Sequence, residues 1–207
     1  PGIKEYIERG YLTTASTKDG AVSTTQEYNV TDFAIAQLAK ALKKNKDEVF
    51  YRNRSISYRN LFDKEFNLLR PRNADASWVR PFNPETGANF QKNLGFIEGN
   101  SWQYTFMVAH DTKGLIRLMG GEQAYSNQLQ KVFDLGQFDM TNEPNIGYPY
   151  LFNYVSIYRL LFIMINTHTN ISTNITSTST NTTTDTSAST ATTATTATAT
   201  ATTTTST

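Results

Sequence analysis

Several residue types and patterns are missing from this chain, and each absence excludes a class of protein. There is no cysteine, so neither a disulfide framework nor a thiolate metal site can form. The net charge is only +1 and no basic face stands out, which argues against a nucleic-acid partner. The apolar run at residues 160–165 is far shorter than the roughly 20 residues that span a bilayer. We therefore expect no membrane span.

The composition changes abruptly along the chain. Residues 1–154 are rich in aromatic side chains and carry ordinary charge, whereas Thr dominates after residue 166, where Asp185 is the only charged residue. Such a segment has little to bury and cannot offset the conformational entropy lost on folding. We expect one domain over residues 1–154, which begins inside a helix. A disordered, low-complexity tail rich in Thr, Ala and Ser should follow over residues 155–207.

Two interpretations of the tail stay open. It can be an authentic Ser/Thr stalk that carries O-glycans, with N-glycosylation sequons at Asn170, Asn174 and Asn181. Alternatively it is not native coding sequence, because residues 155–157 are what a read-through splice donor would encode. Sequons also occur earlier in the chain. They are compatible with a secreted or extracytoplasmic protein, but they are too common to establish the compartment.

Apolar periodicity predicts a mostly α-helical domain. Residues 3–9 form a helix that Gly10 ends. Thr31 and Asp32 are typical of an N-cap and an acidic first turn for a helix at residues 33–43. The expected inward face of that helix consists of Ile35, Leu38, Ala39 and Leu42. Further helices are expected at residues 47–62, 102–119, 123–133 and 150–154.

Two stretches, residues 66–97 and residues 138–147, show no helical period. The first contains several Pro and Gly residues and is expected to form a long irregular insertion with at most a short hairpin. A loop of this length is unusual in a compact domain unless it serves a site. It leads directly to Glu98.

The residues around Glu98 have the chemistry of a sugar-binding site. Glu98 is an acid, Asn100 an amide and Trp102 a flat aromatic surface. Cleavage of a glycosidic bond needs an acid that protonates the departing oxygen and a second group that activates water or attacks carbon. Two plainer interpretations stay open at this stage. Glu98 can be a carboxylate at a helix N-terminus, and Trp102 can be a core residue.

A second group of polar residues stands in the irregular stretch at residues 138–147. Asn142, Glu143 and Pro144 follow one another there. An amide oxygen, a carboxylate and exposed carbonyl groups are hard oxygen ligands of the kind that calcium prefers. Taken alone, the same triplet is also typical of a turn.

Three motifs resemble one known family. They are Glu-Gly-Asn-Ser-Trp-Gln-Tyr at residues 98–104, His-Asp at residues 110–111, and Gly-Leu-Ile-Arg-Leu-Met-Gly-Gly at residues 114–121. Together they closely resemble the family 92 glycoside hydrolases, which are calcium-dependent exo-α-mannosidases. The resemblance extends over residues 1–154 and stops there. It implies that the helices are part of an (α/α)6 toroid.

The resemblance also implies roles for individual residues. Glu98 is expected to be the general acid, with a pKa raised by burial near apolar surface. The expected substrate-binding residues are Asn100, Trp102, Gln103, His110 and Asp111. The expected Ca²⁺ ligands are Asn142, Glu143 and the carbonyl of Thr141. A further pair that resembles the family, Glu27 and Tyr28, is expected to be structural.

One part of the family's machinery has no counterpart in this sequence. The family's general base is a carboxylate in a Gly- and Asp-containing loop, and nothing after Tyr154 matches it. The resemblance thus implies a fragment of an inverting α-1,2-mannosidase-like enzyme that removes terminal mannose from N-glycan-type oligosaccharides or glycoproteins. We expect this chain alone to be inactive. The alternative is a non-catalytic carbohydrate-binding surface protein on a Thr-rich stalk.

Overall fold

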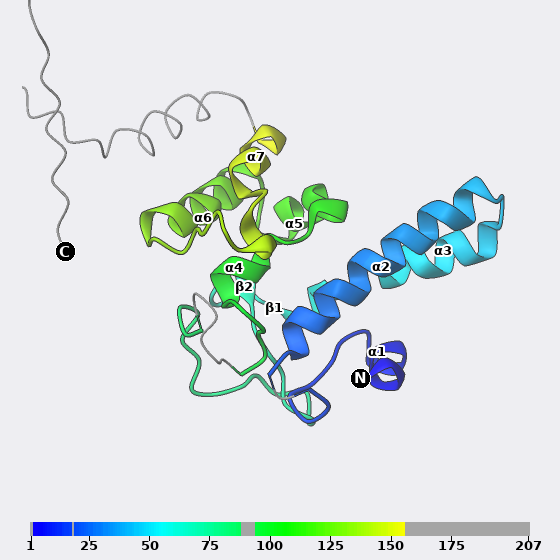
Figure 1. The fold of residues 1–207 in the computed structure, drawn as a ribbon, viewed down its shortest axis with the longest axis horizontal. Coiled ribbons are helices and arrows are strands. Elements are labelled where there is room, and N and C mark those ends of the chain that lie inside the picture. Colours follow the sequence, from blue (N-terminus) through cyan, green and yellow to red (C-terminus); the bar gives the residue numbers. More distant parts are fainter. Residues whose placement is uncertain (1, 18, 88–93, 156–207) are drawn as a thin grey trace, which may run out of the picture. The chain divides into compact units, whose positions relative to one another are not determined.

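The structure is a computed structural model that describes residues 2–17, 19–87 and 94–155. The chain divides into two units, Pro1–Thr169 and Asn170–Thr207, and every described residue lies in the first. This part is mostly helical, as the sequence predicts (Figure 1). The tail that is expected to be disordered lies outside the described residues, except for Val155. None of the helices described is long and apolar enough to cross a bilayer.

The described residues contain seven α-helices, two short strands and four short 3₁₀ turns. The helices are α1 (Ile3–Arg9), α2 (Ala21–Ala41), α3 (Asn45–Arg54), α4 (Ser101–Thr105), α5 (Thr112–Leu118), α6 (Glu122–Asp134) and α7 (Tyr148–Leu151). The strands are β1 (Phe62–Asp63) and β2 (Leu68–Leu69). The 3₁₀ turns are Ser57–Leu61, Ala109–Asp111, Glu143–Asn145 and Phe152–Tyr154.

Helix α2 begins at Ala21, well before the N-cap that the sequence predicts at Thr31. A distant loop explains the earlier start. The carbonyl of Gly95 accepts the N–H groups of Val22 and Ser23, at 2.8 and 3.4 Å, and so satisfies donors that a helix N-terminus leaves free. Gly95 has a φ of 91°, which favours glycine, and a Cβ there would meet Pro71 at 2.7 Å. Tertiary contact, rather than a local cap, starts this helix.

The predicted inward face of α2 is also wrong in part. Leu38 and Leu42 are 60% and 58% exposed, whereas Ala36 and Ala39 are buried. α2 and α3 run side by side as a helical hairpin (Figure 1). The other buried residues of α2 are largely polar: Ser23, Thr25, Gln26, Asn29 and Asp32. Such a face cannot be found from apolar periodicity.

The helix predicted at residues 47–62 ends early, at Arg54, and continues as the 3₁₀ turn Ser57–Leu61. A hairpin follows, in which Phe62 pairs with Leu69 and Asp63 with Leu68. Beyond it the chain is mostly irregular up to Asn100, as the sequence predicts. The fully buried Arg70 anchors this region through its ion pair with Asp63 at 2.8 Å.

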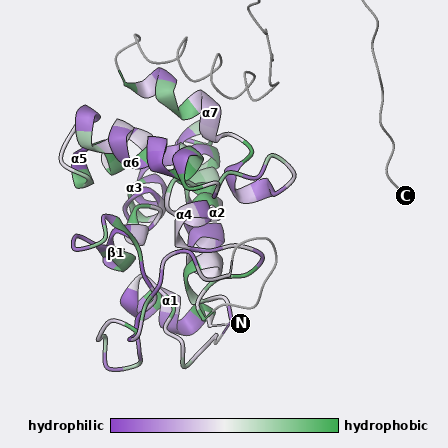
Figure 2. Ribbon diagram, turned by 90° about the vertical axis from the view of Figure 1, so that its left-hand side faces the viewer, coloured by the Kyte–Doolittle hydropathy of each residue, from purple (hydrophilic) through white to green (hydrophobic). Residues whose placement is uncertain are grey.

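The helix predicted at residues 102–119 is interrupted. α4 ends at Thr105 and α5 begins at Thr112. The break is stabilised by Tyr148, whose hydroxyl accepts the Phe106 N–H at 3.1 Å and whose ring packs against that of Phe106. In Figure 2, purple and green segments alternate along α6, which buries Tyr125, Leu129 and Val132 in the same core. The core therefore holds α4 on one side, and the loop that precedes α4 holds it on the other.

Candidate active site

The candidate site is centred on Glu98, whose backbone has a left-handed conformation with a φ of 55°. Residues other than glycine rarely adopt this conformation, and those that do cluster at functional sites. The Tyr104 hydroxyl donates a 2.7 Å hydrogen bond to the Ile97 carbonyl and lies 3.5 Å from Glu98 Oε1. Because the Glu98 side chain is only partly buried, it can reach a ligand from a rigid support.

Two distant segments hold the backbone of Glu98 and its neighbour. From α2, Ser23 Oγ accepts the Ile97 N–H at 2.9 Å. From the irregular stretch after α6, Asn142 Nδ2 donates to the Glu98 carbonyl at 2.8 Å. The structure therefore brings the two polar groups of the sequence, one at Glu98 and the other at Asn142 and Glu143, into contact across 44 positions.

Asn100 acts as the N-cap of α4. Its Oδ1 accepts the Gln103 N–H at 3.0 Å, a typical capping bond. Its Nδ2 donates to the Glu85 carbonyl and to Gln137 Oε1, at 3.1 and 2.7 Å. The fully buried amide is thus engaged on both sides by the protein. These contacts orient α4 behind Glu98, and a direct contact of Asn100 with substrate stays a prediction.

Two fully buried amides beside Glu98 lack hydrogen-bond partners. Neither Oε1 nor Nε2 of Gln103 has one among the described residues, and Asn142 Oδ1 has none. Gln103 lies against the Glu98–Gly99 backbone, since a Cβ on Gly99 would meet its Oε1 at 3.1 Å. Buried polar groups normally find partners, and the exceptions call for a ligand, ion or water. These amides are therefore the strongest indication of a ligand-binding site in the described residues.

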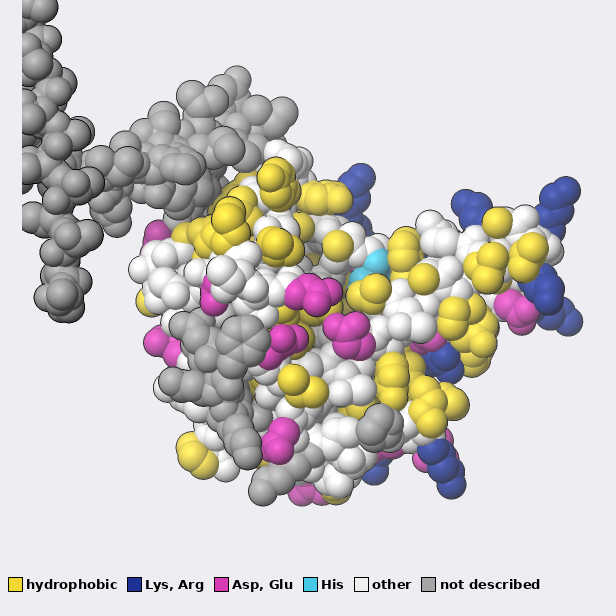
Figure 3. Space-filling view, in the orientation of Figure 1, with side chains coloured by type: hydrophobic (Ala, Val, Ile, Leu, Met, Phe, Trp, Pro, Cys, Tyr) yellow, Lys and Arg dark blue, Asp and Glu magenta, His cyan; other side chains and the backbone are white. Residues whose placement is uncertain are grey.

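Acidic side chains near Glu98 influence one another. Burial and the charges of Glu143 and Glu98 raise the pKa of Glu27, an acid of α2 that the sequence assigns only a structural role. Burial, together with Glu98 and Glu27, also raises the pKa of Tyr104 to about 12, so its phenol stays protonated as a donor. Acidic side chains gather near the middle of the face shown in Figure 3. Glu27 is the site residue that sequence reasoning missed; its one signal is the Glu-Tyr pair.

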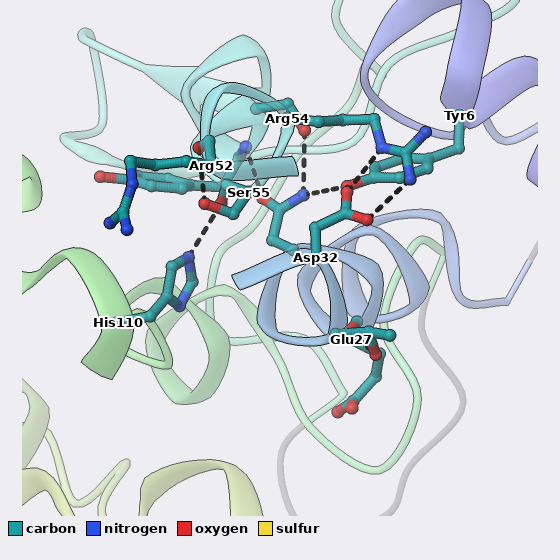
Figure 4. A network of polar contacts seen from close by, with 11 residues as sticks. Tyr6, Glu27, Asp32, Arg52, Arg54, Ser55 and His110 are labelled. Atoms are coloured by element: carbon teal, nitrogen blue, oxygen red, sulfur yellow. Dashed lines mark hydrogen bonds and ion pairs between the residues drawn. The ribbon is translucent and has the colours of Figure 1, made fainter. Parts of the chain in front are cut away.

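His110 and Asp111 are held by the segment that follows α3. His110 Nε2 donates to the Ser55 carbonyl at 2.8 Å (Figure 4), and its Nδ1 is buried without a partner in the described chain. Burial lowers the pKa of His110. Asp111 pairs with Arg59 at 2.7 Å and accepts from the Tyr58 hydroxyl at 2.9 Å. No hydrogen bond within the described residues joins either side chain to the candidate acid, and their contact with substrate stays a prediction.

Trp102 and Thr141 both make contacts within the chain. Trp102 is only 6% exposed and belongs to the core, so its ring presents no open face for stacking. The hydroxyl and N–H of Thr141 both donate to Asp139, at 2.6 and 2.8 Å. The Thr141 carbonyl, the predicted calcium ligand, is not involved in those bonds. Both roles stay predictions.

The left-handed conformation of Glu98 leads to a test of stored strain. Replacing Glu98 with Gly removes a steric cost of about 1–2 kcal/mol, which outweighs roughly 0.4–1 kcal/mol from the greater entropy of Gly in the unfolded chain. We expect Glu98→Gly to raise the free energy of unfolding by roughly 0.5–1 kcal/mol in urea titrations. Lys43→Gly is a matched control at a second left-handed position outside the site, because Lys43 has a φ of 57° in the turn between α2 and α3. A less stable Glu98→Gly chain would contradict strain at this position.

An acid beside unpaired amides and further carboxylates in a mostly helical domain is compatible with the chemistry of a glycoside hydrolase. Residues 1–158 match the model of the Glycosyl hydrolase family 92 catalytic domain. This chain belongs to that family.

Known relatives agree with this assignment. An α-mannosidase of the family from Bacteroides thetaiotaomicron, solved with mannoimidazole, is 30% identical and has a TM-score of 0.67 over 73% of this chain and 22% of its own. An inverting mannosidase of the family from the same organism is 26% identical and has a TM-score of 0.66 over 75% and 24%. An uncharacterized secreted glycosidase of Arthroderma benhamiae is 26% identical over 172 residues, which are 72% of this chain and 21% of that protein. The chain thus spans less than a quarter of the length of these relatives.

Proposed function

We propose that this chain is the acid-bearing part of an exo-α-mannosidase that removes terminal, α-1,2-linked mannose from N-glycan-type oligosaccharides. The observation that supports it best is the group at Glu98, where a residue with a left-handed backbone lies beside amides that lack partners. The mannosidase relatives favour an α-mannoside as the substrate. The α-1,2 linkage and the glycan type come from the resemblance of the sequence motifs.

In this proposal Glu98 donates a proton to the departing glycosidic oxygen. Its backbone is held by Ser23 through Ile97 and by Asn142, so the carboxyl group keeps one orientation toward the bond that breaks. Protonation makes the leaving group a neutral alcohol. A water molecule activated by a second carboxylate then attacks the opposite face of the sugar, which inverts the anomeric configuration. The inverting relative supports this stereochemistry.

The residues near Glu98 also fit a bound Ca²⁺. Asn142 Oδ1 is a buried oxygen without a partner, and the neighbouring Glu143 carboxylate is exposed. Both are hard oxygen donors, as would be the Thr141 carbonyl. No cluster of three His, Cys, Asp or Glu suited to a metal occurs in the described ranges, so amide and carbonyl oxygens must complete the ligand set. When bound, the ion would engage hydroxyl groups of the mannose ring and offset the charge of the surrounding carboxylates.

We propose further that this chain alone does not turn over substrate. The resemblance places the family's general base in a loop for which residues 155–207 offer no matching sequence, and Asp185 is the only acid there. An inverting enzyme without a base loses the step that activates water. The second candidate function is therefore sugar binding without catalysis by a secreted protein with a Thr-rich stalk. The secreted glycosidase relative favours a secreted location.

Calcium removal tests the proposal. We expect the chain to bind methyl α-mannoside in the presence of Ca²⁺ and to lose at least about tenfold in affinity when a chelator removes the ion, because the charge-assisted contacts of a sugar to a bound cation contribute on the order of 1.5 kcal/mol or more. Isothermal titration with and without chelator measures this, and re-addition of Ca²⁺ should restore binding.

Mannose release from an α-1,2-linked mannobiose is followed in the same samples. Calcium-dependent binding without release supports a chain that has the acid and lacks the base. Binding that is indifferent to the chelator would contradict the calcium site. Calcium-dependent release by this chain would contradict the missing base.

A further inference from the structure

A further unexplained group near the site is the carboxylate of Glu27. Glu27 belongs to α2 and is exposed, and no hydrogen bond or ion pair within the described residues engages its carboxylate. We propose that Glu27 is a specificity-determining residue that accepts hydrogen bonds from hydroxyl groups of the sugar bound at Glu98. This inference rests on the proposed function, and it adds to that function a residue of α2.

The register of α2 directs Glu27 toward the site. Ser23 and Glu27 stand four positions apart, so they lie on the same face of the helix, one turn from each other. Ser23 Oγ accepts the Ile97 N–H at 2.9 Å, which places this face against the segment that carries Glu98. Gln26, the neighbour of Glu27, donates to the Tyr104 carbonyl at 3.1 Å. Helix α2 thus contacts the site through Ser23, one turn before Glu27, and through Gln26, directly before it, so the backbone from which the Glu27 side chain extends is held in place.

The charges around Glu27 point to a neutral ligand that donates hydrogen bonds. Glu98 and Glu143 are close enough to act electrostatically on Glu27, yet the three acids do not form a group that could hold one metal ion in the described part of the chain. No Lys or Arg of the described residues forms an ion pair with any of them. Ionised carboxylates are pure acceptors, and they need donors.

A separate observation supports a ligand near Glu98. The buried amide of Gln103 and the buried Oδ1 of Asn142 have no partners, and Asn142 is bonded to the Glu98 carbonyl. Amides supply both donors and acceptors, whereas Glu27 adds acceptors only. A polyol presents both, because each hydroxyl group donates one hydrogen and accepts at two lone pairs. A hexose ring can therefore offer donors to Glu27 and both a donor and an acceptor to the Gln103 amide, whereas a simple cation leaves Gln103 Nε2 without an acceptor and a simple anion leaves Glu27 without a donor.

The test uses the 207-residue chain and methyl α-mannoside as the probe. Glu27→Gln keeps the size of the side chain but removes its charge and gives it two donors. Loss of a hydrogen bond to a charged group should weaken mannoside binding at least about tenfold. Glu27→Asp, which keeps the charge on a shorter side chain, should weaken it less. Glu8→Gln, which neutralises an exposed acid of α1, should leave the affinity unchanged. Calcium affinity and thermal unfolding are measured on all four proteins.

Each result decides the inference. A selective loss of mannoside affinity in Glu27→Gln, with unchanged calcium affinity and unfolding temperature, supports it. Unchanged mannoside affinity overturns the inference and leaves the proposed function intact. A parallel loss of calcium affinity overturns it too, since Glu27 would then serve the ion rather than the sugar. If the unmodified chain itself does not bind the mannoside, the proposed function fails first, and the inference falls with it.

Discussion

Replacing Asp63 with Ala is expected to destabilise the domain by about 3–5 kcal/mol, because the change leaves a buried Arg without its counter-ion. Arg70 is 1% exposed, and its Nη1 donates to Asp63 at 2.8 Å. Its other donors reach only the Val79 carbonyl, at 2.7 and 3.1 Å. The guanidinium cannot move to water, because the rings of Phe66 and Phe82 lie 5.2 and 4.9 Å from it. Urea unfolding followed by circular dichroism measures the loss.

A double substitution separates the charge from the packing. Asp63→Leu with Arg70→Met removes both ions and keeps most of the buried volume, so it should recover much of the stability that Asp63→Ala loses. If the single substitution costs less than about 1 kcal/mol, the pair behaves like an exposed salt bridge and the prediction is wrong.

The same substitution should also disturb the candidate site, because the hairpin supports α4. The Leu69 N–H donates to Thr105 Oγ1 at 2.9 Å, and the Ser101 hydroxyl donates to the Leu69 carbonyl. Both partners belong to α4, the helix that follows Glu98. We therefore expect any mannoside binding of the chain to weaken along with its stability in Asp63→Ala, whereas Glu27→Gln should affect binding alone.

The second large effect is expected from Asp32→Ala, which should cost about 3 kcal/mol or more. Asp32 accepts two 2.7 Å hydrogen bonds from Arg54 and one of 2.6 Å from the Tyr6 hydroxyl (Figure 4). Its carboxylate is almost fully buried and joins α1, α2 and α3. Without it, the Arg54 charge and the Tyr6 hydroxyl lose their acceptor in the interior. Thermal and urea unfolding should both register the loss.

Glu48→Ala provides the matched control for Asp32→Ala. Glu48 pairs with Arg52 at 2.8 Å on the same helix hairpin, but Arg52 is 43% exposed. Exposed pairs of this kind contribute about 0.3–0.5 kcal/mol. A cost of Asp32→Ala similar to that of Glu48→Ala would show that the buried network contributes no more than a surface pair.

The local sequence pattern predicted helix ends correctly where the residues at those ends determine them. Gly10 ends α1 in a left-handed conformation, as the sequence predicts. The helix predicted at residues 123–133 is observed as Glu122–Asp134. The sequence pattern did not predict helix ends that depend on residues far away in the chain. The Gly95 carbonyl starts α2, and Tyr148 stabilises the break after α4. A single sequence does not contain the spatial neighbours that make these contacts.

In the candidate site, too, the sequence predicts some features and misses others. The sequence singles out Glu98, Asn142 and Glu143 by residue type and motif, and the structure brings the first two into contact. The sequence marks Glu27 only through the Glu-Tyr pair, for which it predicts a structural role. It does not reveal that Asn100 is a cap and Trp102 a core residue. For both residues the sequence is compatible with a structural role and with a role in binding, and only the burial of each side chain distinguishes the two.

By itself the sequence determined the mostly helical class, the family and the short segments where chemistry is concentrated. These properties depend on residue types and on spacings within a few turns, which the chain carries locally. The tertiary structure alone decided that α2 faces Glu98, that its buried side is polar, and which amides lack partners. Those properties arise when segments far apart in the chain exclude water together, because a polar group acquires or loses a hydrogen-bond partner only through the neighbours that surround it.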